Sequence, residues 1–265
     1  MKVASLLLIS ALFACCASSQ GAAPGKGDRS AERTCPWPAN LDGVIAAPET
    51  HKVIFENEQV RVLEVAIPPH GKERVHTHCW PSTIYFQQIR DLISRDPDGK
   101  LIFDSRQMKE SEKQKAPFVM WGASEGPHWD ENPDDLTIKM IQVEQIQPDN
   151  RLREPCPWAD VDAVKAAPGN HKIIFENEHV RVLEVTIAPH SKEPVHAHCW
   201  PSTLYIQQAG ESIDRDANGK ILFDSRQLKV KPTFPFVQWT PPQGPHAVEN
   251  LADVPTKLIR IENKD

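Results

Sequence analysis

Apolar and polar residues alternate along several short stretches of the chain, the pattern of β-strands with one buried face. Residues 60–67 are rich in β-branched side chains, and Leu63, Val65 and Ile67 fall on one face of an extended chain. Similar runs occupy residues 83–88, 118–121 and 136–143. No run with helical periodicity extends beyond about two turns. We therefore expect an all-β protein.

Turn signals separate these runs. Asp98-Gly99 and Asn218-Gly219 each precede an apolar stretch, which predicts hairpins closed by type I′ turns. The chain has 24 proline and 12 glycine residues, and proline lacks the N–H that helix interiors need. Many short strands between stiff turns are typical of a sandwich or a barrel.

The strongest feature of the sequence is an internal repeat. Residues 51–88 and residues 171–208 agree at 29 of 38 positions, and the likeness continues into residues 100–107 and 220–227. A period near 120 residues indicates a duplicated domain, because solenoid repeats are much shorter. We expect one domain at 35–148 and a second at 149–265, each long enough to close its own core.

The first residues have a different character. Residues 1–19 contain one early lysine, a short apolar core and small residues, which predicts a secretory signal peptide cleaved after Ser19 or nearby. An alternative is that the segment ending in Cys15 is a lipoprotein box, so that a lipid on Cys15 would be the membrane contact. Residues 20–34 are rich in small and charged residues, which indicates a flexible tether. Either route predicts an exported protein, periplasmic or secreted.

Composition narrows the class of protein. Of the 265 residues, 40% are apolar and 25% are charged, a soluble globular mixture that excludes wholesale disorder and a polytopic membrane protein. The formal net charge is −6, and the charges are dispersed. We therefore expect no nucleic acid partner, which would need a basic surface.

Histidines supply the candidate chemistry, since ten of the eleven fall at matching positions of the two repeats. A spacing of two places both imidazoles of each His-x-His pair on one face of a strand, and imidazoles suit borderline transition metals. A Gly-Pro-His segment follows each pair and could supply a third ligand. We interpret His51 and His171, which start a strand, as structural, and His70 and His190 as solvent-facing.

The order and separation of these motifs resemble the cupin family, and their duplication resembles a bicupin. The resemblance implies that each half forms a cupin barrel, a double-stranded β-helix of the jelly-roll kind. The sequence departs from the family pattern at the glutamate of the first motif, which falls on Thr83 and Thr203, or on Ser82 and Ser202 with the shorter spacing. Some cupin-like dioxygenases hold iron with three histidines and no carboxylate, so the missing glutamate does not exclude a metal.

The resemblance implies a three-histidine metal site in each barrel, for a divalent transition metal such as Fe, Mn, Zn or Ni. The expected ligands are His76, His78, His128, His196, His198 and His246. The alternative is a metal-free pocket whose imidazoles hydrogen-bond buried backbone.

A polar pocket next to the metal is a further expectation. If Thr83 points inward like His78, the two-residue period of a strand brings Tyr85 and Gln87 to the same face. The expected pocket-lining residues are Thr83, Tyr85, Gln87, Thr203, Tyr205 and Gln207. The alternative is that these side chains hydrogen-bond within the core. Glu73 and Glu193 fall on the opposite face by alternation, so we do not expect them to be ligands.

Four cysteines remain beyond the predicted signal peptide, and each repeat holds two of them. An even number in an exported protein favours disulfides, and four cysteines allow three connectivities. The symmetric one joins Cys35 to Cys79 and Cys156 to Cys199. Small buried thiols are the alternative.

Two classes of function follow from the sequence. The first is a metal-dependent enzyme of the dioxygenase, isomerase or decarboxylase type, whose open coordination positions would receive a small molecule. The second is a non-catalytic, metal-free ligand-binding protein, because fold alone does not decide function. Both have a small-molecule partner, and a homodimer is compatible with either.

Overall fold

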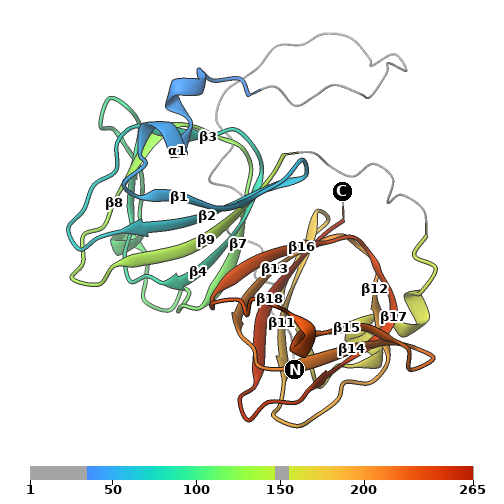
Figure 1. Ribbon diagram of the computed structural model, residues 1–265. Coiled ribbons are helices and arrows are strands. Elements are labelled where there is room, and N and C mark those ends of the chain that lie inside the picture. Colours follow the sequence, from blue (N-terminus) through green and yellow to red (C-terminus); the bar gives the residue numbers. More distant parts are fainter. Residues whose placement is uncertain (1–34, 147–154, 265) are drawn as a thin grey trace, which may run out of the picture.

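A computed structural model of the chain describes residues 35–146 and 155–264, which form two domains of the same design (Figure 1). The predicted signal peptide (1–19), the tether (20–34) and Cys15 lie outside the described residues. Within the described ranges, no helix has the length and apolar character needed to cross a membrane.

The first domain consists almost entirely of short strands, as the sequence predicts. One helical turn, α1 (Gly43–Ala46), and the 3-10 turns Ala39–Leu41 and Ser105–Gln107 connect them. The strands are β1 (His51–Glu56), β2 (Val60–Ile67), β3 (His76–His78), β4 (Ser82–Gln88), β5 (Ile93–Arg95), β6 (Leu101–Asp104), β7 (Phe118–Gly122), β8 (Glu125–Glu131) and β9 (Ile138–Gln145).

The second domain repeats this order. Its helical turn is α2 (Ala163–Ala166), and its 3-10 turns are Ala159–Val161 and Ser225–Gln227. Its strands are β10 (His171–Glu176), β11 (Val180–Ile187), β12 (His196–His198), β13 (Ser202–Gln208), β14 (Ser212–Asp216), β15 (Ile221–Asp224), β16 (Phe236–Thr240), β17 (Gln243–Asn250) and β18 (Thr256–Asn263).

Each domain folds its strands into two sheets. In the first domain the strand orders are β1-β2-β9-β4-β7 and β3-β8-β5-β6, and the second domain repeats them as β10-β11-β18-β13-β16 and β12-β17-β14-β15. From β2 to β9 the chain crosses between the two antiparallel sheets at every step except the β5–β6 hairpin, which is the order of a jelly roll. The predicted fold class, two tandem all-β barrels, is confirmed.

The interior of the first barrel contains a buried apolar cluster. In the first domain Leu63, Val65 and Ile67 project from β2 into a cluster with Phe86 of β4 and Met140 of β9. Leu63 and Ile67 are fully buried, and burial of side chains of this size stabilises a fold by roughly 1.5–3 kcal/mol each. The two-residue period of β2 therefore directs one set of side chains into the barrel and the other set outward.

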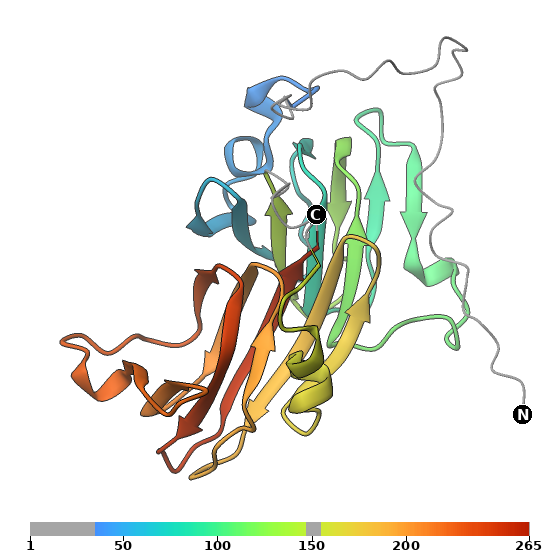
Figure 2. The ribbon, with the colours of Figure 1, turned by 90° about the vertical axis from the view of Figure 1, so that its right-hand side faces the viewer.

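The outward set of β2 does not face solvent, because the two domains pack against each other through these sheets (Figure 2). Val60 and Val62 share one buried cluster with Val180 and Val182 of the second domain. Hydrogen bonds add to this contact: Gln87 Nε2 donates to Tyr205 Oη over 3.0 Å, and Gln145 Nε2 donates to Asn263 Oδ1 over 3.0 Å. The domains therefore share a core in addition to the one inside each barrel.

The predicted hairpins are present, but their turns differ from the prediction. Strands β14 and β15 pair antiparallel across the segment that contains Asn218 and Gly219. Only the glycine has a positive φ, of 85°, whereas a type I′ turn requires two such residues. Gly99 has the matching φ of 84° in the first domain. One left-handed residue per turn is the geometry of a three-residue hairpin loop with a bulge.

Two disulfides tie the segment before the first 3-10 turn of each domain to the barrel. Cys35 is bonded to Cys79, and Cys156 is bonded to Cys199. The symmetric connectivity is therefore the correct one of the three. Each bridge ends at the residue that directly follows a His-x-His pair, so the covalent link anchors the strand that carries these histidines.

Candidate functional site

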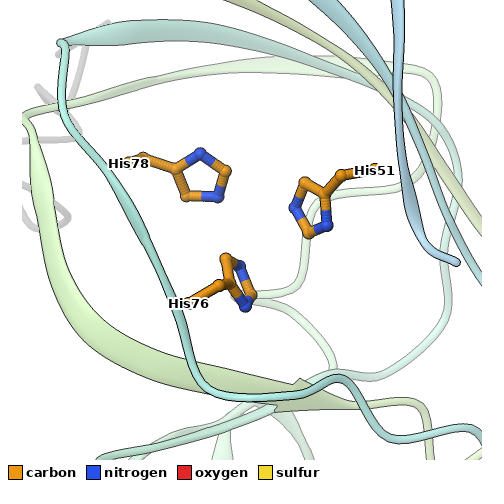
Figure 3. A group of neighbouring side chains, drawn as sticks. All are labelled: His51, His76 and His78. Atoms are coloured by element: carbon orange, nitrogen blue, oxygen red, sulfur yellow. The ribbon is translucent and has the colours of Figure 1, made fainter. Parts of the chain in front are cut away.

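Four imidazoles gather inside each barrel. In the first domain His51 comes from the start of β1, His76 and His78 from β3, and His128 from β8. Nitrogens of His51, His76 and His78, one from each ring, lie within 4.8 Å of one another, and Figure 3 shows the three rings converging. The His128 ring centroid lies 4.4 Å from that of His76 and 5.8 Å from that of His78.

Strand pairing explains why these residues meet. His76 is the cross-strand partner of His128, and His51 is the partner of Val65, whose side chain points into the barrel. Thr77, between the two histidines of β3, points the other way and donates its hydroxyl to the carbonyl of Leu41 over 3.2 Å. The alternation expected for His-x-His therefore holds in the structure.

The Nδ1 atom of each imidazole faces a hydrogen-bond acceptor. His76 Nδ1 lies 2.8 Å from the carbonyl oxygen of Arg74, and His128 Nδ1 lies 2.8 Å from that of Gly126. His78 Nδ1 lies 3.0 Å from Glu144 Oε1. His51 Nδ1 lies 3.0 Å from Thr50 Oγ1, whose own proton is donated to a backbone carbonyl. A neutral ring that donates from Nδ1 keeps its lone pair on Nε2.

The second domain repeats this arrangement with different chain neighbours. His196 Nδ1 lies 2.9 Å from the carbonyl oxygen of Pro194, and His246 Nδ1 lies 2.9 Å from that of Gly244. His198 Nδ1 lies 2.8 Å from Glu262 Oε1, and His171 Nδ1 lies 3.3 Å from the carbonyl oxygen of Ala167. In each barrel Nε2 is therefore the nitrogen with a free lone pair, and nitrogens of three of the four rings lie close enough together to share one metal ion.

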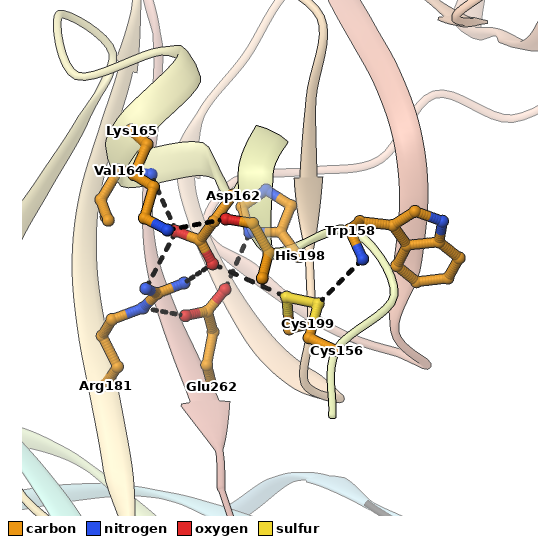
Figure 4. Close-up of a disulfide and its surroundings, with 10 residues drawn as sticks. Cys156, Trp158, Asp162, Val164, Lys165, Arg181, His198, Cys199 and Glu262 are labelled. Carbon is orange, nitrogen blue, oxygen red and sulfur yellow. Dashed lines mark hydrogen bonds and ion pairs between the residues drawn. A yellow bond between two sulfur atoms is a disulfide. The ribbon is translucent and has the colours of Figure 1, made fainter. Parts of the chain in front are cut away.

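A buried chain of ion pairs supports one histidine in each barrel. In the second domain Glu262, which accepts from His198, also accepts from Arg181 Nε over 2.5 Å. Arg181 in turn donates from both terminal nitrogens to the carboxylate of Asp162, over 3.0 and 2.9 Å (Figure 4). Asp162 begins α2 by accepting from the N–H of Val164. In the first domain Asp42, Arg61 and Glu144 form the same chain behind His78.

Burial keeps most of these imidazoles neutral. Desolvation lowers the pKa of His51 and of His171 to about 3, and that of His246 to about 4. Desolvation and the neighbouring rings lower the pKa of His76 still further. For His78 desolvation is outweighed by the hydrogen bond and charge of Glu144, so its pKa is raised. Neutral imidazole is the form that binds a metal.

Glu73 and Glu193 lie closer to the site than strand alternation predicts. Both side chains are buried, and Glu73 Oε1 lies 3.5 Å from His51 Nδ1, while Glu193 Oε1 lies 3.7 Å from His171 Nδ1. Burial raises the pKa of Glu73 well above its ordinary value and that of Glu193 to about 8. Neither residue belongs to a regular strand, so the two-residue period did not apply to them.

The structure brings together the six histidines named from the sequence and adds two. His51 and His171, interpreted as structural, lie in the same clusters. In the sequence these two histidines are marked only by their matching positions in the repeat at the start of a strand. Which strands this strand pairs with, and therefore whether its first residue faces the other histidines, is visible only in the structure. His70 and His190 are exposed, as expected, with positive φ angles of 55° and 52°.

The expected pocket-lining residues lie elsewhere. Thr83 and Thr203 pair with Val143 and Ile261 on the outward face of the sheet, and Tyr85 and Tyr205 belong to the buried cluster between the domains. Gln87 forms a hydrogen bond with Tyr205 of the second domain, and Gln207 forms one with Tyr85 of the first. Tyr85 also lines a cavity of about 500 Å³ between the domains. The premise that Thr83 points inward like His78 is wrong, because Phe86 of β4 faces the interior, and strand alternation places Thr83 with Tyr85 on the opposite, outward face.

Among known proteins, similarity to this chain was found only in solved structures. No protein-family model matches the chain, and no curated protein matches it either. A cupin domain from Bordetella pertussis is 20% identical over 36% of this chain and 90% of its own, with a TM-score of 0.30. AerE from Microcystis aeruginosa is 13% identical over 82% of this chain and 98% of its own, with a TM-score of 0.46.

Bacillus subtilis oxalate decarboxylase, which has Mn(II) centres, is 13% identical over 81% of this chain and 72% of its own, with a TM-score of 0.48. Because these identities and TM-scores are low, the fold is assigned from the strand order described above and not from these matches. By that order the chain consists of two tandem jelly-roll barrels, each with a cluster of buried histidines.

Proposed function

We propose that each barrel binds one divalent transition metal ion through Nε2 atoms of its buried histidines, and that the protein uses these centres to transform a small molecule. The ligands in the first barrel come from His51, His76, His78 and His128. Those in the second come from His171, His196, His198 and His246. The observation that carries the proposal is that Nδ1 of all eight rings faces a hydrogen-bond acceptor.

This arrangement fits a metal for a chemical reason. Histidines that bind metals usually donate their other ring N–H to a carbonyl or a carboxylate, which fixes the tautomer and raises the basicity of the coordinating nitrogen. Glu144 and Glu262 hold such a place behind His78 and His198. An all-imidazole donor set suits Fe, Mn, Zn or Ni better than the hard cations Mg²⁺ and Ca²⁺.

The chain's own residues would prepare the site. The ion-pair chains of Arg61 and Arg181 hold the supporting carboxylates, and the disulfides anchor the ends of β3 and β12. A metal bound here would supply Lewis-acid activation of a coordinated small molecule or water. Three imidazoles would leave a position open for that molecule on a four-coordinate metal, and four would do so only on a metal with more than four ligands.

The same proposal includes export. Disulfides form and persist in oxidising compartments, and both domains contain one. The predicted signal peptide is consistent with this location. Sequencing the N-terminus of the mature protein tests this part: a chain that begins near residue 20 supports cleavage, a lipid-modified Cys15 supports anchoring, and an intact Met1 contradicts both.

Elemental analysis of the protein purified without chelators tests the metal. We expect about one transition metal ion per barrel. The content should fall by about half in His76→Ala and in His196→Ala, and it should not change in the control variants His70→Ala and His190→Ala, whose imidazoles are exposed. A metal-free protein that cannot be loaded with Fe, Mn, Zn or Ni would contradict the proposal and favour the metal-free, ligand-binding alternative.

The assembly state is a separate proposal. A homodimer is compatible with the fold, and light scattering of the purified protein decides between one and two chains per particle.

A further inference from the structure

Several interior positions near the histidines differ in charge between the two barrels, among them Gln142 against Arg260 and Glu125 against Gln243. Gln142 of β9 pairs with Leu63, and Arg260 of β18 pairs with the equivalent Leu183. In the same way Glu125 of β8 pairs with His78, whereas Gln243 of β17 pairs with His198. The repeat therefore replaces a neutral amide by a guanidinium and a carboxylate by a neutral amide within one site.

Arg260 is buried in the second barrel, with 4% of its surface exposed. Its Nε donates to Ser202 Oγ over 3.0 Å, and its Nη1 donates to Gln243 Oε1 over 2.8 Å. Its Nη2 is buried without a hydrogen-bond partner. Burial lowers the pKa of Arg260 to about 10, so that the group remains charged at neutral pH.

The carboxylate next to Arg260 is shared with other groups. Glu262 Oε1 lies 3.5 Å from Arg260 Nε, but it also accepts from His198, while its other oxygen accepts from Arg181. Burial lowers the pKa values of all four imidazoles of this barrel, and the positive charge of Arg260 lowers them further. The guanidinium thus lies beside the histidine cluster.

The first barrel has the opposite electrostatic character. It keeps the ion-pair chain of Asp42, Arg61 and Glu144, but Gln142 replaces the second arginine. Glu125 Oε2 lies 3.7 Å from His128 Nε2, so a carboxylate borders the coordinating side of the cluster. Relative to this barrel, the second barrel gains one positive charge and loses one negative charge at these two positions.

We propose that the histidine site of the second barrel binds a small carboxylate through Arg260, and that the site of the first barrel does not. The proposal deepens the proposed function, because the carboxylate would lie next to the metal of that barrel. A carboxylate supplies the acceptor that the buried Nη2 lacks, and guanidinium and carboxylate match in charge and geometry. In the first barrel the same anion would meet Glu125 and no compensating cation.

Calorimetric titration of the full mature chain with acetate tests this assignment, with acetamide as a neutral control of nearly the same shape. We expect one acetate per chain and no measurable binding of acetamide. Arg260→Gln, which gives the second barrel the residue of the first, should weaken acetate binding about tenfold or more. Arg260→Lys keeps the charge and should retain part of the binding.

The reciprocal variant should create a second site, in the first barrel. Gln142→Arg combined with Glu125→Gln should raise the stoichiometry from one acetate per chain to two, which keeps the test decisive if Arg260→Gln does not fold. Two acetates on the unmodified chain, equal binding of acetamide, or acetate binding unchanged in a folded Arg260→Gln variant would each overturn the proposal.

Metal content measured on the same samples separates this inference from the proposed function. Titrations are run on the metal-loaded protein and on the chelator-treated protein. Acetate binding that depends on Arg260 in a protein that takes up no metal would refute the metal centre and support the carboxylate site. If the protein binds metal but its acetate affinity does not depend on Arg260, the metal centre is supported and the carboxylate site is refuted.

Discussion

His78 Nδ1 and Glu144 Oε1 lie 3.0 Å apart inside the first barrel, and His198 and Glu262 repeat this pair at 2.8 Å in the second. The pair joins residues from different sheets that are 66 positions apart in the chain. It determines which nitrogen of the ring carries the proton. The tautomer of a candidate ligand is therefore a property of the closed barrel.

Replacing this carboxylate should weaken metal binding. In Glu144→Gln the acceptor loses its charge, so the imidazole of His78 becomes a poorer donor to a metal. We expect a loss of about tenfold in metal affinity for the first barrel, within the range known for such supporting groups. Competition with a chelator of known affinity measures it. Glu49→Gln, at an exposed carboxylate paired with Arg74, is the control and should leave the affinity unchanged.

The buried arginine of the first barrel should matter far more for stability than an exposed one. Arg61→Ala leaves the buried carboxylates of Asp42 and Glu144 without their partner, and breaking a buried ion pair costs about 3–5 kcal/mol. Arg74→Ala removes an equally well-formed but exposed pair with Glu49, which should cost at most about 1 kcal/mol. Urea unfolding compares the two variants, and similar losses would contradict the role given to Arg61.

The disulfides should stabilise both barrels. Cys35 and Cys79 are separated by 44 positions, and closing a loop of this length stabilises a protein by about 3–4 kcal/mol in the loop-entropy model. The double variant Cys35→Ala, Cys79→Ala should lose about that much free energy of unfolding, and Cys156→Ala, Cys199→Ala should behave alike. A thiol assay on the unfolded, unreduced mature chain should detect none of these four cysteines; four free thiols would contradict the bridges.

Acid should destabilise the metal-free protein through its buried histidines. The pKa of His51 is lowered to about 3 in the folded state, so between that value and its ordinary value of 6.5 the unfolded chain binds the proton and the folded chain does not. Stability therefore rises with pH across this window, by at most about 1.4 kcal/mol per pH unit for each such histidine. His171 and His246 contribute with the same sign.

Other groups oppose this trend, so the comparison needs a variant. The raised pKa values of Glu193 and His78 contribute stability that is lost as pH rises. Thermal unfolding of chelator-treated protein at pH 5 and pH 7.5 should show a smaller pH dependence in His51→Gln than in the unmodified chain. The exposed His70→Gln is the control. An unchanged dependence in His51→Gln would show that its imidazole is not buried neutral.

Separation of the domains should expose the shared core. A chain limited to residues 35–148 would present Val60, Val62 and Tyr85 to water, all of which are buried by the second domain. We expect this fragment to self-associate or to lose stability relative to the full chain. Sedimentation analysis measures the association, and a stable monomeric fragment would contradict the buried contact between the domains.

Local patterns were enough to predict most of the strands and some of the site. The alternation in residues 60–67 identified β2 with its correct bounds, and the spacing of His76 and His78 placed both rings on one face of β3. The turn after Asp98 was correctly located but given the wrong type, because glycine and its neighbour can adopt several turn geometries with the same residues.

The pocket prediction failed for a related reason. The prediction took Thr83 to point inward like His78, but the chain crosses from one sheet to the other between these residues, and in β4 it is Phe86, on the face opposite Thr83, that packs inside the barrel. The period is a property of a single strand and carries no information across such a crossing. Tyr85 and Gln87 therefore lie against the second domain rather than in the barrel.

The sequence by itself determined the all-β class, the duplication and the two His-x-His pairs, because these depend on contacts between near neighbours or on simple identity between the repeats. Only the tertiary structure decided that His51 and His171 join the clusters, that Glu144 and Glu262 stand behind them, and that Arg260 distinguishes one barrel from the other. Those relationships depend on which strands pair, and pairing between distant strands is set by closure of the whole barrel.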